Sequence, residues 1–102
     1  MKRETKKRVM EEFMRNFDFE KAHAFMVIND EWFYNDGEKY RPTVEDVKKM
    51  ARELLEYAFN VHQKFPDFFT TTRYNFTVAV TDEDVEIMYH PITSTAFADN
   101  CL

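Results

Sequence analysis

The chain has 102 residues, a length typical of one domain, and we expect residues 1–102 to form a single domain. Hydrophobic residues make up 44% and aromatic residues 17%, which is enough apolar surface for a core and excludes an intrinsically disordered chain. Cys101 is the only cysteine, so an intrachain disulfide is excluded and a reducing, cytoplasmic location is favoured. No apolar run approaches the length of a membrane span, and no membrane association is expected.

Charge is unevenly distributed along the chain. The formal net charge is −5, but residues 1–8 carry five basic side chains and one glutamate, a net +4 that leaves −9 on the other residues. A body this acidic repels a phosphate backbone, so direct nucleic-acid binding is not expected. The basic residues 1–8 are typical of a solvated first helical turn.

Two short helices are predicted in the N-terminal part. Over residues 4–17, apolar residues recur at three- and four-residue intervals, as in an amphipathic helix. Asp18 has the side chain of a helix N-cap and Glu20 suits the first turn, so a second helix follows. The apolar positions of the two helices are Val9, Met10, Phe13, Met14 and Phe17, then Ala22, Phe25, Met26 and Ile28.

A turn signal separates these helices from the next one. Asp36-Gly37 lies between the aromatic residues 32–34 and Lys39-Tyr40, and Asp-Gly is a preferred pair in tight hairpin turns because glycine accepts a positive φ. A short β-ribbon or ordered loop is therefore expected here.

A long amphipathic helix is predicted over residues 43–64. Thr43 is a good N-cap, and Pro66 ends the helix because the residue before a proline avoids the helical region. The apolar stripe between them consists of Val44, Val47, Ala51, Leu54, Ala58, Val61 and Phe65.

The spacing then changes to that of strands. Apolar residues alternate with polar ones over residues 75–80 and again over 85–90, which predicts an antiparallel hairpin, and residues 68–72 form a candidate edge strand. Residues 92–102, after Pro91, are expected to form a loose tail. The fold class is therefore α+β, with two short N-terminal helices, one long amphipathic helix and a C-terminal antiparallel β-hairpin or small sheet.

No catalytic or cofactor-binding constellation is recognisable. The only glycine is Gly37, which excludes glycine-rich phosphate-binding loops. His23, His62 and His90 could converge with Cys101 on a zinc ion, but no pair has the spacing of metal ligands, so no metal site is predicted. We expect neither an enzyme nor a cofactor.

Two features are candidate contact surfaces for a partner. The acidic turn formed by Asp82, Glu83, Asp84 and Glu86 could mimic phosphates and occupy a basic nucleic-acid channel, although it is also typical of a soluble hairpin tip. The other is the aromatic segment Trp32, Phe33, Tyr34 and Tyr40, of which Trp32, Tyr34 and Tyr40 are the candidate contacts, because Trp and Tyr dominate binding hot spots. Aromatic side chains are nevertheless more often packed in a core than displayed.

Four short motifs follow one another along the chain: FDFEKAH at 17–23, NDG at 35–37, RPTVEDV at 41–47 and ARELL at 51–55. Their order resembles that of a group of small, uncharacterised bacteriophage and prophage proteins. The resemblance covers residues 17–89 and has no known activity attached, so no residue role carries over. One departure is Arg73-Tyr74-Asn75, where a glycine pair is expected before the first strand.

What the resemblance implies is a phage context, in which small acidic proteins often bind and disable host defence proteins, CRISPR nucleases among them. The leading hypothesis is a non-enzymatic inhibitor of a bacterial host protein, such as a nuclease, acting in the host cytoplasm. One alternative is a small-ligand binder or nucleotide sponge, and another is a metal-binding protein. The cations available to a nucleotide would be Lys39, Arg41, Arg52 and Arg73.

Overall fold

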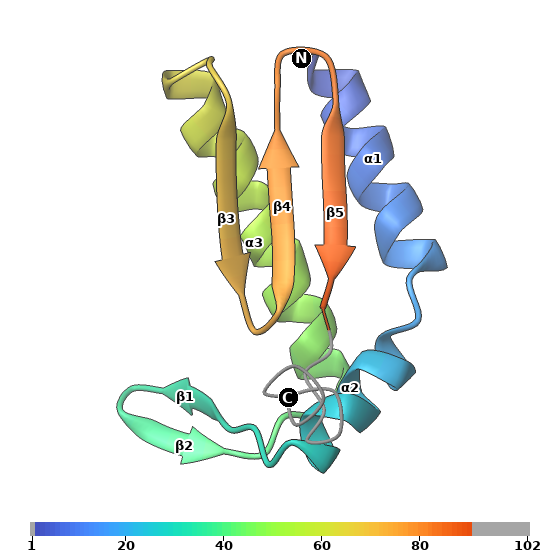
Figure 1. The fold of residues 1–102 in the computed structure, drawn as a ribbon, viewed down its shortest axis with the longest axis vertical. Helices are drawn as coiled ribbons and strands as arrows, with labels where there is room; N and C mark the ends of the chain where they lie inside the picture. Colours follow the sequence, from blue (N-terminus) through green and yellow to red (C-terminus); the bar gives the residue numbers. More distant parts are fainter. Residues whose placement is uncertain (1, 91–102) are drawn as a thin grey trace, which may run out of the picture.

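The computed structural model describes residues 2–90 and confirms the α+β class, with three helices and two small antiparallel sheets in that range (Figure 1). The predicted tail at 92–102 and Cys101 lie outside the described residues. In chain order the elements are α1 (Arg3–Asn16), α2 (Phe19–Ile28), β1 (Phe33–Asn35), β2 (Glu38–Tyr40), α3 (Val44–Lys64), β3 (Phe69–Arg73), β4 (Phe76–Val80) and β5 (Val85–Tyr89).

The C-terminal sheet has the strand order β3-β4-β5, so the candidate edge strand is confirmed and the hairpin becomes a three-stranded sheet. Its central strand carries Phe76, Val78 and Val80, all buried, on the face that packs against α3. Helix α3 lies behind this sheet in Figure 1, and α1 lies to the right of β5 in that view. The period-two pattern of β4 therefore marks its core-facing residues correctly.

Helix α3 begins and ends where the sequence predicts. Thr43 and Asp46 form a capping box, in which the Thr43 hydroxyl accepts from the Asp46 backbone N–H and the Asp46 carboxylate accepts from the Thr43 backbone N–H. The prediction that Phe65 continues the apolar stripe is wrong, because the helix ends at Lys64 and the Phe65 side chain is 68% exposed.

Asp18 follows the end of α1 and caps the start of α2. The Lys21 backbone N–H donates to the Asp18 carboxylate at 3.0 Å, which confirms Asp18 as the N-cap of α2. Aromatic rings then connect α1 and α2 to the sheet, since Phe17 packs against both Phe19 and Phe76 with centroid distances of 4.9 and 5.3 Å. Ile28, expected among the apolar positions of α2, is instead 67% exposed at the end of the helix.

The β3–β4 turn replaces the expected glycine pair with two larger residues. Tyr74 and Asn75 both have positive φ, 49° and 69°, as a two-residue hairpin turn of this hand requires. A tyrosine in this region costs about 1–2 kcal/mol relative to ordinary backbone. Its ring stacks on that of Phe33 at 4.2 Å, so packing between the two sheets opposes the strain.

Candidate functional site

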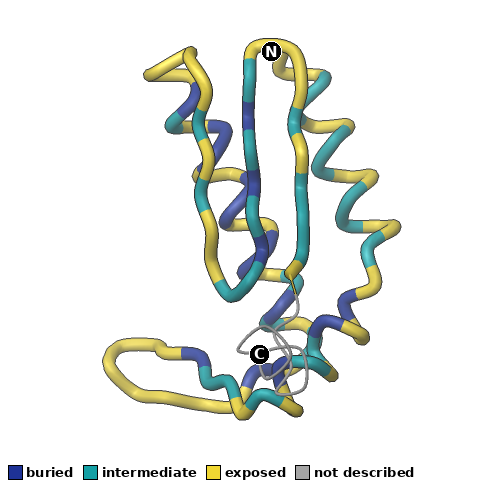
Figure 2. The backbone as a smooth tube through the Cα atoms, in the orientation of Figure 1, coloured by how far each residue is buried: buried dark blue, intermediate teal, exposed yellow. Residues whose placement is uncertain are grey.

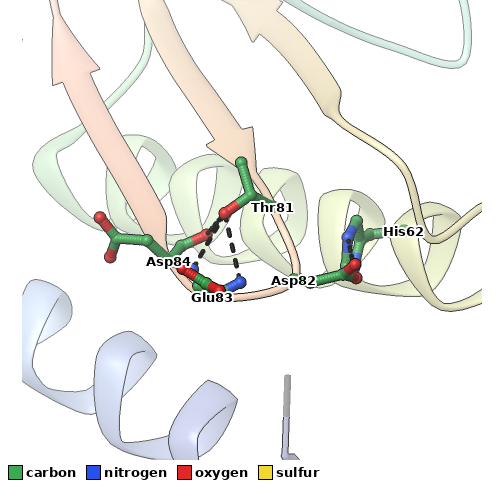
Figure 3. A network of polar contacts seen from close by, with 5 residues as sticks. All are labelled: His62, Thr81, Asp82, Glu83 and Asp84. Carbon is green, nitrogen blue, oxygen red and sulfur yellow. Dashed lines mark hydrogen bonds and ion pairs between the residues drawn. The ribbon is translucent and has the colours of Figure 1, made fainter.

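The acidic turn connects β4 to β5 and is held by its own hydrogen bonds (Figure 3). The Thr81 hydroxyl accepts from the backbone N–H groups of Glu83 and Asp84 at 3.3 and 3.0 Å. The Asp84 carboxylate also accepts from the Val85 N–H at 2.8 Å. Asp82, Glu83, Asp84 and Glu86 are all exposed, so the structure presents four carboxylates to solvent on an ordered backbone.

One of these carboxylates also lies beside a buried histidine of α3. The His62 side chain is almost fully buried, and its Nε2 atom lies 3.5 Å from the Asp82 carboxylate (Figure 3). The same Nε2 atom has no hydrogen-bond partner among the described residues. Asp82 is therefore the member of the acidic turn with a neighbour in the core, and replacing it affects α3 as well as the surface charge.

The aromatic segment forms a two-stranded ribbon that projects from the body (Figure 1). Phe33 pairs with Tyr40, and Tyr34 pairs with Lys39, so the two pairs face opposite sides of the ribbon. Phe33 is buried, which makes it the ring that plugs the core, whereas Tyr34 is 65% exposed and Tyr40 is 38% exposed. Figure 2 shows the exposed ribbon as a mostly yellow loop.

Trp32 lies at the base of the ribbon and is half-buried beneath cations. The Arg41 guanidinium sits 3.8 Å from the centre of the Trp32 ring, and the Lys39 ammonium sits 4.7 Å from it. Arg41 is itself held by an ion pair with Asp30. These two contacts hold the Trp32 ring in one orientation.

The acidic turn and the ribbon lie at opposite ends of the longest axis of the described molecule, which measures 40 Å (Figure 1). The structure therefore does not bring the two predicted contact surfaces together. A single compact contact can use one of them, and a partner that uses both must extend along the body.

A cleft of about 280 Å³ lies between the ribbon, α3 and the β3–β4 turn. Tyr34, Tyr40 and Tyr74 line it. Its charged residues are two cations, Lys49 and Arg73, and two carboxylates, Asp46 and Glu53. Of the four cations considered for nucleotide binding, Arg73 alone lines this cleft, since Lys39 and Arg41 cover Trp32 and Arg52 lines a separate hollow beside Met14. Lys49 was not predicted as a cation of this cleft, because helical spacing assigns it to the solvent-facing side of α3.

Glu31, next to Trp32, carries a perturbed carboxyl group. Burial raises the pKa of Glu31 above its ordinary value of 4.5, and its Oε2 atom has no hydrogen-bond partner among the described residues. Burial also raises the pKa of the phenols of Tyr74 and Tyr89, and the charge of Glu31 contributes in the same direction. The folded state thus favours the neutral form of Glu31.

The substitution Glu31→Gln is therefore expected to stabilise the protein near neutral pH. Stability contributed by neutral Glu31 is fully present below pH 4.5 and is lost as the pH rises through the raised folded-state pKa. Urea unfolding near neutral pH and below pH 4.5 measures the free energy of unfolding of variant and wild type. The difference between the two proteins should vanish at the lower pH. Glu38→Gln on the exposed strand β2 controls for the removal of one negative charge, and an equal gain from that variant would contradict the assignment.

A third surface was not predicted. Tyr57, Phe65 and Phe68 expose 54%, 68% and 65% of their surface near the end of α3 and the start of β3. The sequence does carry a signal for this surface. Tyr57 lies outside the apolar stripe of α3, and Phe65 and Phe68 flank Pro66 in the connection that follows. Large exposed aromatic side chains that gather near one sheet edge are typical of contact surfaces.

The histidines have separate surroundings. The His23 Nε2 atom donates to the carbonyl oxygen of Pro42 at 2.8 Å, and His62 lies beside Asp82 as described above. Within residues 2–90, no group of three or more His, Cys, Asp or Glu side chains could hold a metal ion. None of the helices in that range is both long and apolar enough to cross a membrane.

No protein-family model, curated protein or solved structure matches this chain. The surfaces described above are therefore the basis for a functional proposal.

Proposed function

We propose that this chain is a non-enzymatic, phage-encoded binding protein that inhibits a bacterial defence or host protein by docking its β1–β2 ribbon on that partner. The observation that carries the proposal is the exposed Tyr34 beside a Trp32 ring already stacked under Arg41 and Lys39. Trp, Tyr and Arg are the residue types that contribute most to binding hot spots.

The ribbon also suits binding because little order has to be acquired on contact. Its turn has φ values of 51° at Asp36 and 82° at Gly37, the conformation that closes a two-residue hairpin with the twist of its strands. Phe33 anchors it by stacking on Tyr74. Side chains that are already ordered lose less conformational entropy on binding, so more of the contact energy appears as affinity.

The acidic turn supplies a second contact in this proposal. Its four exposed carboxylates are complementary to a basic surface, such as the nucleic-acid channel of a nuclease. Because exposed charges act mainly on the association rate, the contribution of this turn should weaken as salt is added.

The experiment that tests the proposal is a pull-down from bacterial lysate with tagged protein, read by mass spectrometry. Wild type is compared with two variants that keep Phe33: Trp32→Ala with Tyr34→Ala in the ribbon, and a reversal of Glu83, Asp84 and Glu86 to Lys that leaves Asp82 beside His62. We expect one host protein that wild type recovers stoichiometrically and the ribbon variant loses. The charge variant should recover less of it at low salt, and this difference from wild type should shrink as salt is added. A host protein that is recovered equally by all three would contradict the proposed surfaces.

A nucleotide is the second candidate function, because three tyrosine rings in the cleft can stack on a base while Lys49 and Arg73 face its phosphates, although Asp46 and Glu53 offset their charge. Thermal shift against a nucleotide panel tests it, with Arg73→Gln as the variant that removes one cation of the cleft and Arg52→Gln as the matched control outside it. This candidate predicts a shift that Arg73→Gln abolishes and Arg52→Gln retains. If no nucleotide shifts the wild type, the candidate is eliminated.

A further inference from the structure

The outer edge of β3 is an open pairing surface. In the order β3-β4-β5, β3 has a paired neighbour on one side only among the described residues. Arg73 pairs with Phe76 across the two-residue turn, which makes this the hydrogen-bonded pair that closes the hairpin. Because hydrogen-bonded and non-bonded pairs alternate, the backbone groups of Thr70 and Thr72 point away from β4 and toward the open edge.

Most of this edge is open to strand pairing. Residues 69–72 of β3 are Phe and three threonines, with no proline, charge or bulge, and threonine favours extended backbone; Arg73, the last residue of the strand, carries its one charge. The other outer strand, β5, carries Glu86 and lines a hollow together with α1. Both outer strands have a strand partner on one side only among the described residues, but the two edges differ, because residues 69–72 of β3 are uncharged.

The surroundings of the β3 edge are apolar. A groove of about 390 Å³ lies between α3 and β3 and is lined by residues that include Leu54, Tyr57 and Thr71. The Tyr57 ring packs on Phe69 at 6.0 Å and is still 54% exposed, and Phe68 at the start of the strand is 65% exposed. An added strand would remove this apolar surface from water while pairing the free backbone groups.

We propose that the occupant of this edge is β3 of a second copy of the chain, paired antiparallel about Thr70. In this register, Thr70 faces Thr70 of the second copy, Phe69 faces Thr71, and Asp67 faces Arg73. The last pair brings opposite charges together twice, once on each side of the symmetry axis. Shifting the register by two residues in either direction places Arg73 opposite a phenylalanine and loses both ion pairs.

The pairing is self-complementary and closed, as a two-fold dimer requires. It joins the two sheets into one six-stranded sheet with both α3 helices on the same face, because residues that face each other across an antiparallel pair share a face. The two Tyr57 side chains then lie on the same side of the junction. This dimer uses a surface separate from the ribbon, so each copy keeps its ribbon available.

The test is sedimentation velocity of the purified full chain over micromolar to millimolar concentrations. Wild type is expected to sediment as a dimer of the 12.4 kDa chain. Thr70→Pro removes an outward N–H while leaving the hydrogen bonds between β3 and β4 intact, and it should weaken the dimer at least tenfold, an order-of-magnitude estimate from the backbone bonds lost. Circular dichroism verifies that the variant remains folded. A monomeric wild type, or a folded Thr70→Pro variant that dimerises as wild type does, would overturn the proposal.

A charge swap tests the register itself. Asp67→Arg should produce a monomer, and combining it with Arg73→Asp should restore the dimer, because the opposite charges again face each other. Glu86→Arg makes the same change of charge on β5, away from the open edge, and should leave the dimer unchanged. If the double variant stays monomeric while each protein is folded, the register is wrong and the proposal fails in this form.

Discussion

Replacing Phe76 by alanine is expected to lower the free energy of unfolding by about 3–5 kcal/mol. The Phe76 side chain is 1% exposed, and its ring packs against those of Phe17 and Tyr89 with centroid distances of 5.3 and 4.7 Å. It thereby joins the N-terminal helices to β4 and β5. Its removal leaves a cavity among rigid rings that cannot close around it.

Urea unfolding followed by circular dichroism measures this loss, and Phe65→Ala provides the matched control. Phe65 has the same side chain but is 68% exposed, so its removal should change the free energy of unfolding by less than about 0.5 kcal/mol. Equal losses from the two substitutions would show that the aromatic cluster around Phe76 does not stabilise the fold as described.

Removing the ribbon rings is expected to have the largest effect on binding. Each of Trp32→Ala and Tyr34→Ala should weaken binding of the host partner by about 2 kcal/mol or more, roughly thirtyfold in the dissociation constant. Trp32 contributes by supporting the Arg41 and Lys39 side chains that stack on its ring, and Tyr34 contributes through exposed ring area.

Titration calorimetry with the purified partner measures these effects per binding site. Phe65→Ala removes an aromatic ring of similar exposure outside both the ribbon and the β3 junction, and it should change the dissociation constant by less than about twofold. If Phe65→Ala weakens binding as much as Tyr34→Ala does, the partner contacts the end of α3 and the ribbon is not the principal contact.

The regular elements could be predicted because local chemistry and tertiary packing agree in them. The apolar stripe of α3 and the Thr43 cap identify one long helix, and alternation over residues 76–80 identifies a strand with one buried face. The Asp36-Gly37 pair identifies the ribbon turn, because its backbone preference does not depend on distant contacts.

Tertiary contacts decide the features that the sequence could not predict. The turn at Tyr74 and Asn75 lacks glycine, and its tyrosine packs on Phe33, a residue 41 positions earlier. Lys49 belongs to the polar side of α3, yet it lines a cleft once the ribbon folds over it. No local pattern gives the separation of the acidic turn from the ribbon, since both are exposed hairpin turns and only the packing of the sheets places them at opposite ends.

The proposed role of the ribbon is tested most directly by photo-cross-linking from position 34 in bacterial lysate. A photoreactive phenylalanine analogue replaces Tyr34, and the same analogue at Glu86 reports on the acidic turn. We predict one host protein cross-linked from position 34, in a band that excess unmodified protein competes away. A host protein captured from position 86 and not from position 34, or no capture from either in lysates with active defence systems, would contradict docking through the ribbon.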